Sequence, residues 1–109
     1  RVQIARAIAQ QTDLMLLDEP TSNLDLSHQL EVLNIIRKLC KSGRAAIMSI
    51  HDLTLAARYC DRIVVLSDQR VVADGSPSEV ITQECLLKYF KVRARIHREA
   101  ATDSITISV

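Results

Sequence analysis

The segment LMLLDEP, residues 14–20, constrains the fold of this 109-residue chain more than any other. Four apolar residues lead into Asp18 and Glu19, and a proline then ends the run. A short apolar run before a breaker is typical of a strand buried on both faces, and ligands bind where the strands of a parallel sheet end. Asp18 could hold Mg²⁺ through its water shell, and Glu19 could position or deprotonate a water molecule aimed at a phosphate. On these residues alone, a strand that ends in two solvated acids explains the pattern equally well.

Residues 27–40 predict an amphipathic helix after this strand. Apolar side chains recur there at three-residue steps, and Gly43 follows as a C-cap. The apolar stripe consists of Leu30, Leu33, Ile36 and Leu39, widened by Leu26, Ile35 and Cys40. A second apolar run, residues 45–50, predicts the next strand. A helix between two parallel strands crosses right-handed and returns the second strand beside the first.

The second apolar run ends in His51, as the first ends in Asp18 and Glu19. Because parallel strands end at the same edge of a sheet, we expect these three side chains to converge. A histidine at that edge can bond a phosphate or a water molecule, depending on its tautomer. Two plainer interpretations of His51 stay open, namely a helix N-terminal residue beside Asp52 and a core histidine.

A β-hairpin is predicted after a short helix at about residues 53–59. The strand over residues 62–67 returns through residues 70–74. The turn between them contains no glycine. A two-residue primed turn would force Gln69 into positive φ at a cost of roughly 1 kcal/mol, so we expect either a different turn or some strain.

Two further patterns describe the C-terminal part of the chain. Ser76, Pro77 and Glu79 form a capping box that opens a helix. Alternating apolar residues over 92–97 and 105–109 predict two short, half-exposed strands that pair as a hairpin through a longer loop.

Three ordered motifs resemble the C-terminal half of the ABC-type ATPase domain, a P-loop NTPase of the RecA-like class. LLDEP resembles the Walker B segment, SNLD resembles the D-loop, and the histidine after the next strand resembles the H-loop. Residues 1–10 resemble the helix that directly follows the LSGGQ-type signature. The resemblance implies an α/β fold with a parallel sheet flanked by helices and a C-terminal hairpin. It also implies one partial ABC ATPase domain over residues 1–109, with no second domain.

The resemblance assigns roles to individual residues. It implies that Asp18 binds Mg²⁺, that Glu19 is the catalytic base and that His51 contacts the γ-phosphate of ATP. The D-loop residues that would meet a second ATPase subunit, in a dimer enclosing two ATP molecules, are Ser22, Asn23 and Asp25. Asp25 could also simply cap the following helix, and the two roles are compatible.

The sequence lacks the loop that cradles phosphates. Its only two glycines are Gly43 and Gly75, so no G-x-x-x-x-G-K-[ST] motif occurs, and the signature would lie before residue 1. Because these loops supply positioning and charge neutralisation in phosphoryl transfer, we expect no ATPase activity from the 109 residues alone.

The continuation after His51, HDLTLAARYCDRIVVLSDQRVVADGSPSEV, is most similar to importer ATPases for iron-siderophores, haem and vitamin B12. Membership would imply ATP hydrolysis coupled to uptake, at the cytoplasmic face of the cell membrane. The implied partners are transmembrane permease subunits and, indirectly, a substrate-binding protein. Two other interpretations stay open: a soluble ABC ATPase of DNA repair or translation, and a truncated, non-catalytic binding module.

The composition of the chain argues against several other classes of function. The net charge is +1, and the three aromatic residues do not alternate with a basic stripe, which argues against nucleic-acid binding. No apolar run approaches the roughly 18 residues of a membrane span. The three cysteines have no C-x-x-C spacing and indicate neither a zinc site nor a disulfide framework.

Overall fold

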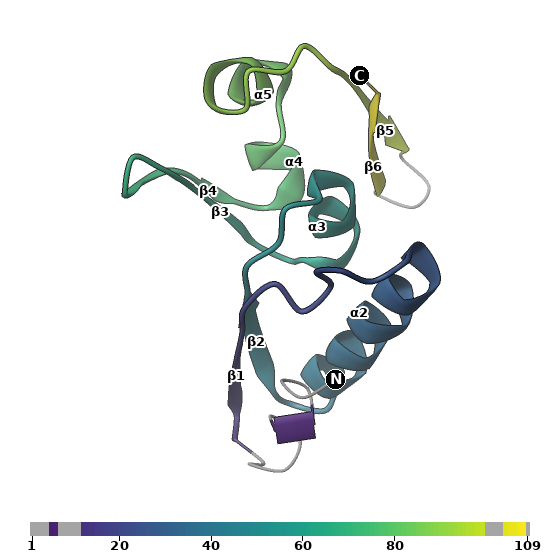
Figure 1. The fold of residues 1–109 in the computed structure, drawn as a ribbon. Helices are drawn as coiled ribbons and strands as arrows, with labels where there is room; N and C mark the ends of the chain where they lie inside the picture. Colours follow the sequence, from purple (N-terminus) through teal and green to yellow (C-terminus); the bar gives the residue numbers. More distant parts are fainter. Residues whose placement is uncertain (1–4, 7–11, 100–103, 109) are drawn as a thin grey trace. The chain divides into compact units, whose positions relative to one another are not determined.

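The computed structural model describes residues 5–6, 12–99 and 104–108 (Figure 1). The chain divides into two compact units, with the boundary between His51 and Asp52. Residues 5–6 are helical, and the rest of the helix expected over residues 1–10 lies outside the described residues. Within the described ranges, no helix has the length and apolar character needed to cross a membrane.

Two parallel strands and the helix between them form the first unit (Figure 1). The elements are β1 (Leu14–Leu17), α2 (Leu26–Lys41) and β2 (Ala45–Met48). The strands pair in parallel, with Leu14 opposite Ala45 and Leu17 opposite Met48. The predicted strand, helix, strand arrangement is confirmed. The first strand, predicted over residues 14–18, ends one residue earlier, and the second, predicted over residues 45–50, ends two residues earlier.

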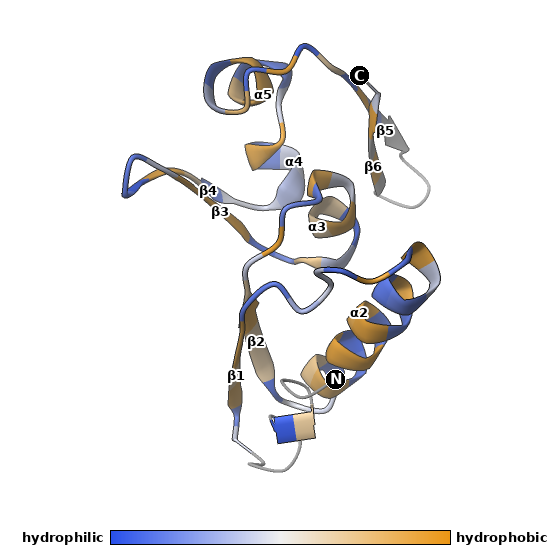
Figure 2. Ribbon diagram, in the orientation of Figure 1, coloured by the Kyte–Doolittle hydropathy of each residue, from blue (hydrophilic) through white to orange (hydrophobic). Residues whose placement is uncertain are grey.

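Helix α2 is amphipathic, as predicted, and Figure 2 shows its alternating apolar and polar faces. Its buried side chains are Val32, Leu33 and Ile36. Leu26, in the first turn, is 64% exposed, and Ile35 is also exposed, so these two members of the predicted apolar stripe are not buried within the described residues. Leu26 shares the helix face of Leu33 but lies in the first turn, whereas Ile35, two residues after Leu33, lies on nearly the opposite side of the helix. Gly43 follows the helix with φ +105°, which glycine adopts without strain.

The strands of the first unit bury one face only. Met15 and Leu17 are buried, whereas Leu14 and Leu16 between them are exposed, and so is Ile47 on β2. Among the described residues the strands are therefore covered on one face, where the sequence predicted burial on both. Successive strand residues point to opposite faces, and among these residues only one face is covered.

The second unit contains two hairpins and three short helices. Its elements are α3 (Leu53–Tyr59), β3 (Ile63–Ser67), β4 (Arg70–Gly75), α4 (Pro77–Val80), α5 (Gln83–Tyr89), β5 (Arg95–Glu99) and β6 (Ser104–Ser108). Buried side chains from α3, β3, α4, α5 and β6 form its core, and they include Leu55, Ile63, Val80, Leu86 and Ile105.

The turn between β3 and β4 is a two-residue turn, the case in which the sequence predicted strain at Gln69. Ser67 pairs with Arg70 across it, and both intervening residues have positive φ, 51° at Asp68 and 62° at Gln69. At the other end of the hairpin, the Arg62 guanidinium donates two hydrogen bonds to the Asp74 carboxylate, at 2.7 and 2.6 Å.

The predicted capping box and terminal hairpin are both present. The Ser76 hydroxyl accepts the N–H of Glu79, whose carboxylate accepts the backbone N–H of Ser76. β5 and β6 pair antiparallel, with Arg95 opposite Ser108 and Glu99 opposite Ser104. The first of these strands begins three residues later than predicted and includes residues 98–99, which were expected in the loop. The rest of the expected loop, residues 100–103, lies outside the described residues.

Candidate nucleotide site

Asp18 and Glu19 directly follow β1, at the carboxyl end of the parallel pair. The pairing continues one residue beyond β2, where the Ser49 N–H donates to the Leu17 carbonyl at 3.1 Å. Ser49 is thereby brought beside the two acids. Its hydroxyl donates to Asp18 Oδ1 at 2.8 Å and accepts the backbone N–H of Glu19, also at 2.8 Å.

His51 reaches the same edge from the end of β2. Its Nε2 contacts Glu19 Oε1, and the two side chains are 85% and 37% exposed, so a ligand in solution can approach both. His51 is neither a core histidine nor the helix cap, because Asp52 caps α3 by accepting the N–H groups of Thr54 and Leu55. The predicted convergence is confirmed for Glu19 and His51, and Asp18 joins them through Ser49.

The D-loop residues form a turn that leads into α2. The Ser22 N–H donates to the Glu19 carbonyl at 3.0 Å, and Thr21 beside it is buried. Asn23 is exposed and adopts φ 63°, which Asn tolerates better than most residues. The turn thus holds Ser22 and Asn23 next to the acidic strand end.

Asp25 is the N-cap of α2. Its Oδ1 accepts the backbone N–H of His28 at 2.9 Å and lies 2.7 Å from His28 Nδ1. The backbone hydrogen bond from His28, followed by the bond to its ring, lowers the pKa of Asp25 below its usual value. The capping role that the sequence left open is therefore present, while contact of Ser22, Asn23 and Asp25 with a second subunit stays a prediction.

The donor chemistry of the strand end fits a nucleotide-bound Mg²⁺. Mg²⁺ prefers oxygen ligands, keeps several waters, and is usually held by one or two carboxylates plus substrate phosphates. Asp18 is exposed and supplies such a carboxylate, oriented by the Ser49 hydroxyl. Across the described ranges, no three His, Cys, Asp or Glu side chains come together as a protein-only metal cage. These residues therefore suit a Mg²⁺ site in which phosphates and water supply the remaining ligands.

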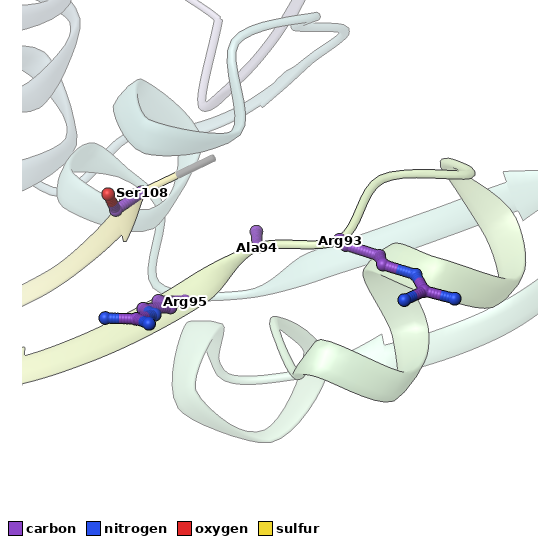
Figure 3. A pocket seen from close by; sticks show the side chains of 4 residues that line it. All are labelled: Arg93, Ala94, Arg95 and Ser108. Atoms are coloured by element: carbon purple, nitrogen blue, oxygen red, sulfur yellow. The ribbon is translucent and has the colours of Figure 1, made fainter.

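A pocket of about 490 Å³ lies elsewhere, in the second unit, lined by Arg93, Ala94, Arg95 and Ser108. Figure 3 shows the side chains of Arg93 and Arg95 pointing away from each other. Two guanidinium groups that diverge cannot clamp one anion, so this pocket lacks the arrangement of a phosphate site.

Ser49 was not predicted as a site residue, because its position depends on the register of two strands about 30 residues apart in the chain. The available clue was its place two residues before His51, near the end of the second apolar run. A polar residue at that point faces the end of the neighbouring strand when the pair is in register.

No protein-family model matches the sequence. The chain is 44% identical over 109 residues to the cobalamin import ATP-binding protein BtuD of Halobacterium salinarum, covering 99% of this chain and 27% of that protein. It is 48% identical over 90 residues to the hemin import ATP-binding protein HmuV of Rhodococcus jostii, covering 83% and 31%. It is 42% identical over 97 residues to the petrobactin import ATP-binding protein FpuD of Bacillus anthracis, covering 88% and 36%.

Two solved structures share the fold. One is a metal-chelate type ABC transporter in an inward-facing conformation, with a TM-score of 0.78 and 27% identity, covering 96% of this chain and 42% of the other. The second is cbiO1 from Clostridium perfringens, part of the ABC transporter complex cbiONQ, with a TM-score of 0.64 and 28% identity, covering 78% and 34%. The chain thus spans 27% to 36% of the length of the three sequence relatives named above. In sequence and fold the chain is thus similar to ATP-binding subunits of ABC transporters, and it matches the C-terminal part of those proteins.

Proposed function

We propose that this chain is part of the ATP-hydrolysing subunit of an ABC importer that takes up an iron-siderophore, haem or cobalamin-type substrate. The observation that carries the proposal is the cluster of Asp18, Glu19, Ser49 and His51 at the carboxyl ends of two parallel strands. The relatives named for cobalamin, hemin and petrobactin import support the cargo class.

In this proposal Glu19 positions the attacking water and accepts its proton. His51, in contact with the Glu19 carboxylate, holds that base in place and bonds the γ-phosphate of ATP. Asp18 would hold Mg²⁺ in part, and the ion would supply charge neutralisation at the phosphates of ATP.

The same proposal extends to the partners. Ser22, Asn23 and Asp25 would face a second ATPase subunit, and the closing of two subunits over two ATP molecules would drive transmembrane permease subunits. A substrate-binding protein would act through the permease and not touch this chain. The subunit would work at the cytoplasmic face of the membrane and would not bind nucleic acid.

Residues 1–109 would form one portion of a single ABC ATPase domain, with no second domain among them. The phosphate loop and the signature would come from other parts of that domain. We therefore expect no ATPase activity from these 109 residues by themselves, because most of the positioning and charge neutralisation would be missing.

The first test is to read the coding sequence upstream of Arg1 and to express the complete open reading frame. The substitution Glu19→Gln should preserve ATP binding and lower turnover by about 10²-fold or more, the usual scale for a lost general base. Glu31→Gln, on the exposed side of α2, is the matched control and should leave turnover unchanged. Equal turnover of wild type and Glu19→Gln would remove Glu19 from the chemistry.

The cargo class is tested in cells. Disruption of the gene should abolish ATP-dependent uptake of one labelled substrate among a ferric siderophore, haem and cobalamin. Retention of uptake for all three would contradict the importer assignment, even where the purified protein hydrolyses ATP.

A further inference from the structure

The hydroxyl of Ser49 lies between the two acidic residues of the site. It donates to Asp18 Oδ1 at 2.8 Å and accepts the backbone N–H of Glu19 at 2.8 Å. One oxygen atom therefore fixes both the carboxylate of Asp18 and the peptide that carries Glu19. An alanine would remove both bonds at once, whereas a threonine would keep the hydroxyl.

The Glu19 backbone needs such support. Its φ of 44° is unusual for a residue with a side chain, and Pro20 after it restricts its backbone further. A conformation of this kind persists only where its surroundings over-determine it. On one side the N–H of Glu19 is held by Ser49, and on the other its carbonyl accepts the N–H of Ser22 at 3.0 Å.

The side chain of Glu19 is in turn held by His51. If the backbone relaxed, the Cα–Cβ direction of Glu19 would change and its carboxylate would leave the position beside the histidine. A displacement of about 1 Å at a reacting group can cost on the order of 10²-fold in rate. Ser49 makes no contact with Glu19 Oε1 or with His51 in the described hydrogen bonds, so its effect would pass through Asp18 and the Glu19 peptide.

We propose that Ser49 is a positioning residue of the nucleotide site, which locks the Asp18 carboxylate and the strained Glu19 peptide in the geometry that hydrolysis requires. The proposal rests on the proposed ATPase function for its kinetic consequence, but its structural half can be tested without turnover.

The structural half is tested by amide exchange in the full-length protein, followed by NMR at Glu19. Ser49→Ala should speed exchange of the Glu19 amide about fivefold or more, because its hydrogen-bond acceptor is gone. The amide of Gln29, which donates to Asp25 within the first turn of α2, is the internal control and should keep its rate. An unchanged rate at Glu19 in Ser49→Ala would overturn the proposal.

The kinetic part of the proposal is tested by placing Thr or Val, two nearly isosteric side chains, at position 49. Ser49→Thr should keep kcat within about twofold, while Ser49→Val should lower kcat about tenfold or more with little change in the KM for ATP. Ser42→Ala is a matched control, because this exposed hydroxyl donates to the Leu39 carbonyl far from the acids in the sequence, and kcat should not change. Equal activity of the Thr and Val variants would show that shape and not the hydroxyl matters, and would overturn the proposal.

The two proposals fail in different ways. A wild-type protein that neither binds nor hydrolyses ATP refutes the ATPase function, whatever the exchange experiment shows. A wild-type protein that hydrolyses ATP, with an Ser49→Val variant of equal kcat, leaves the function intact and refutes the role of Ser49.

Discussion

Gln69 occupies a backbone position that suits glycine. It is the second residue of the two-residue turn between β3 and β4, with φ 62°, and its side chain is exposed. A left-handed conformation costs a residue with a Cβ roughly 1 kcal/mol or more, and glycine removes that cost. Glycine also gains freedom in the unfolded chain, which offsets about 0.5–1 kcal/mol. Gln69→Gly should therefore be neutral or stabilise the fold by up to about 1 kcal/mol.

The prediction has a second basis in turn chemistry. The substitution would place glycine after Asp68, and Asp-Gly is one of the pairs preferred in type I′ hairpin turns. The Gln69 side chain is exposed, so the change removes little packing. A gain of this size corresponds to a Tm increase between zero and about 4 °C in a domain of about 150–250 residues, and to a smaller increase in a larger one.

The assay is a thermal melt of the full-length protein, with Gln69→Ala as the control. Alanine keeps the Cβ and the strain, so its Tm should match that of the wild type to within about 1 °C. A Gly variant that melts clearly below the Ala variant would refute the reasoning, because it would mean that this residue does not have positive φ in solution. ATP turnover should be the same in all three proteins, since the turn lies in the other compact unit from Asp18 and Glu19.

Two further predictions concern the ends of α2. Gly43→Ala should destabilise the fold by about 1 kcal/mol, measured by urea unfolding, because φ +105° is strained for alanine although nothing lies near enough to clash. Equal stability would contradict the positive φ. Asp25→Ala should lower the Tm at pH 7, while Asp25→Asn retains the cap and most of the stability. The folded-state pKa of Asp25 is lowered, so its contribution to stability is fully present above about pH 4 and is lost as the pH falls through that folded-state pKa. The Tm difference between wild type and Asp25→Ala should therefore narrow in thermal melts at acid pH. A gap that stays constant down to pH 2 would contradict this assignment.

The sequence predicted those parts of the fold that depend on local chemistry. The capping box at Ser76 and Glu79 is present because it needs only residues three apart. The turn at Gln69 also follows from two short strands separated by two residues. The convergence of Glu19 and His51 follows from a more general rule, that parallel strands joined by one helix end at the same edge.

The predictions that failed depend on neighbours that an apolar pattern does not identify. Leu14 and Leu16 are as apolar as Met15 and Leu17, and only the position of the covering elements decides which pair is buried. Leu26 fits the periodicity of α2, but it lies in the first turn and is exposed. Ser49 was missed for the same reason, because its partners are set by strand register and not by local sequence.

Positive φ at Glu19 and at Gln69 has the same local cost but a different origin. At Gln69 the turn demands the conformation, so glycine is the better residue and nothing chemical is lost with the side chain. At Glu19 glycine would also relieve the strain, yet it would remove the carboxylate that contacts His51. The strain at Glu19 is therefore tolerated because separate contacts hold its N–H, its carbonyl and its carboxylate, through Ser49, Ser22 and His51. It follows that loosening any one of these three should act on Glu19 first and on the rest of the fold little, which separates a positioning defect from a general loss of stability.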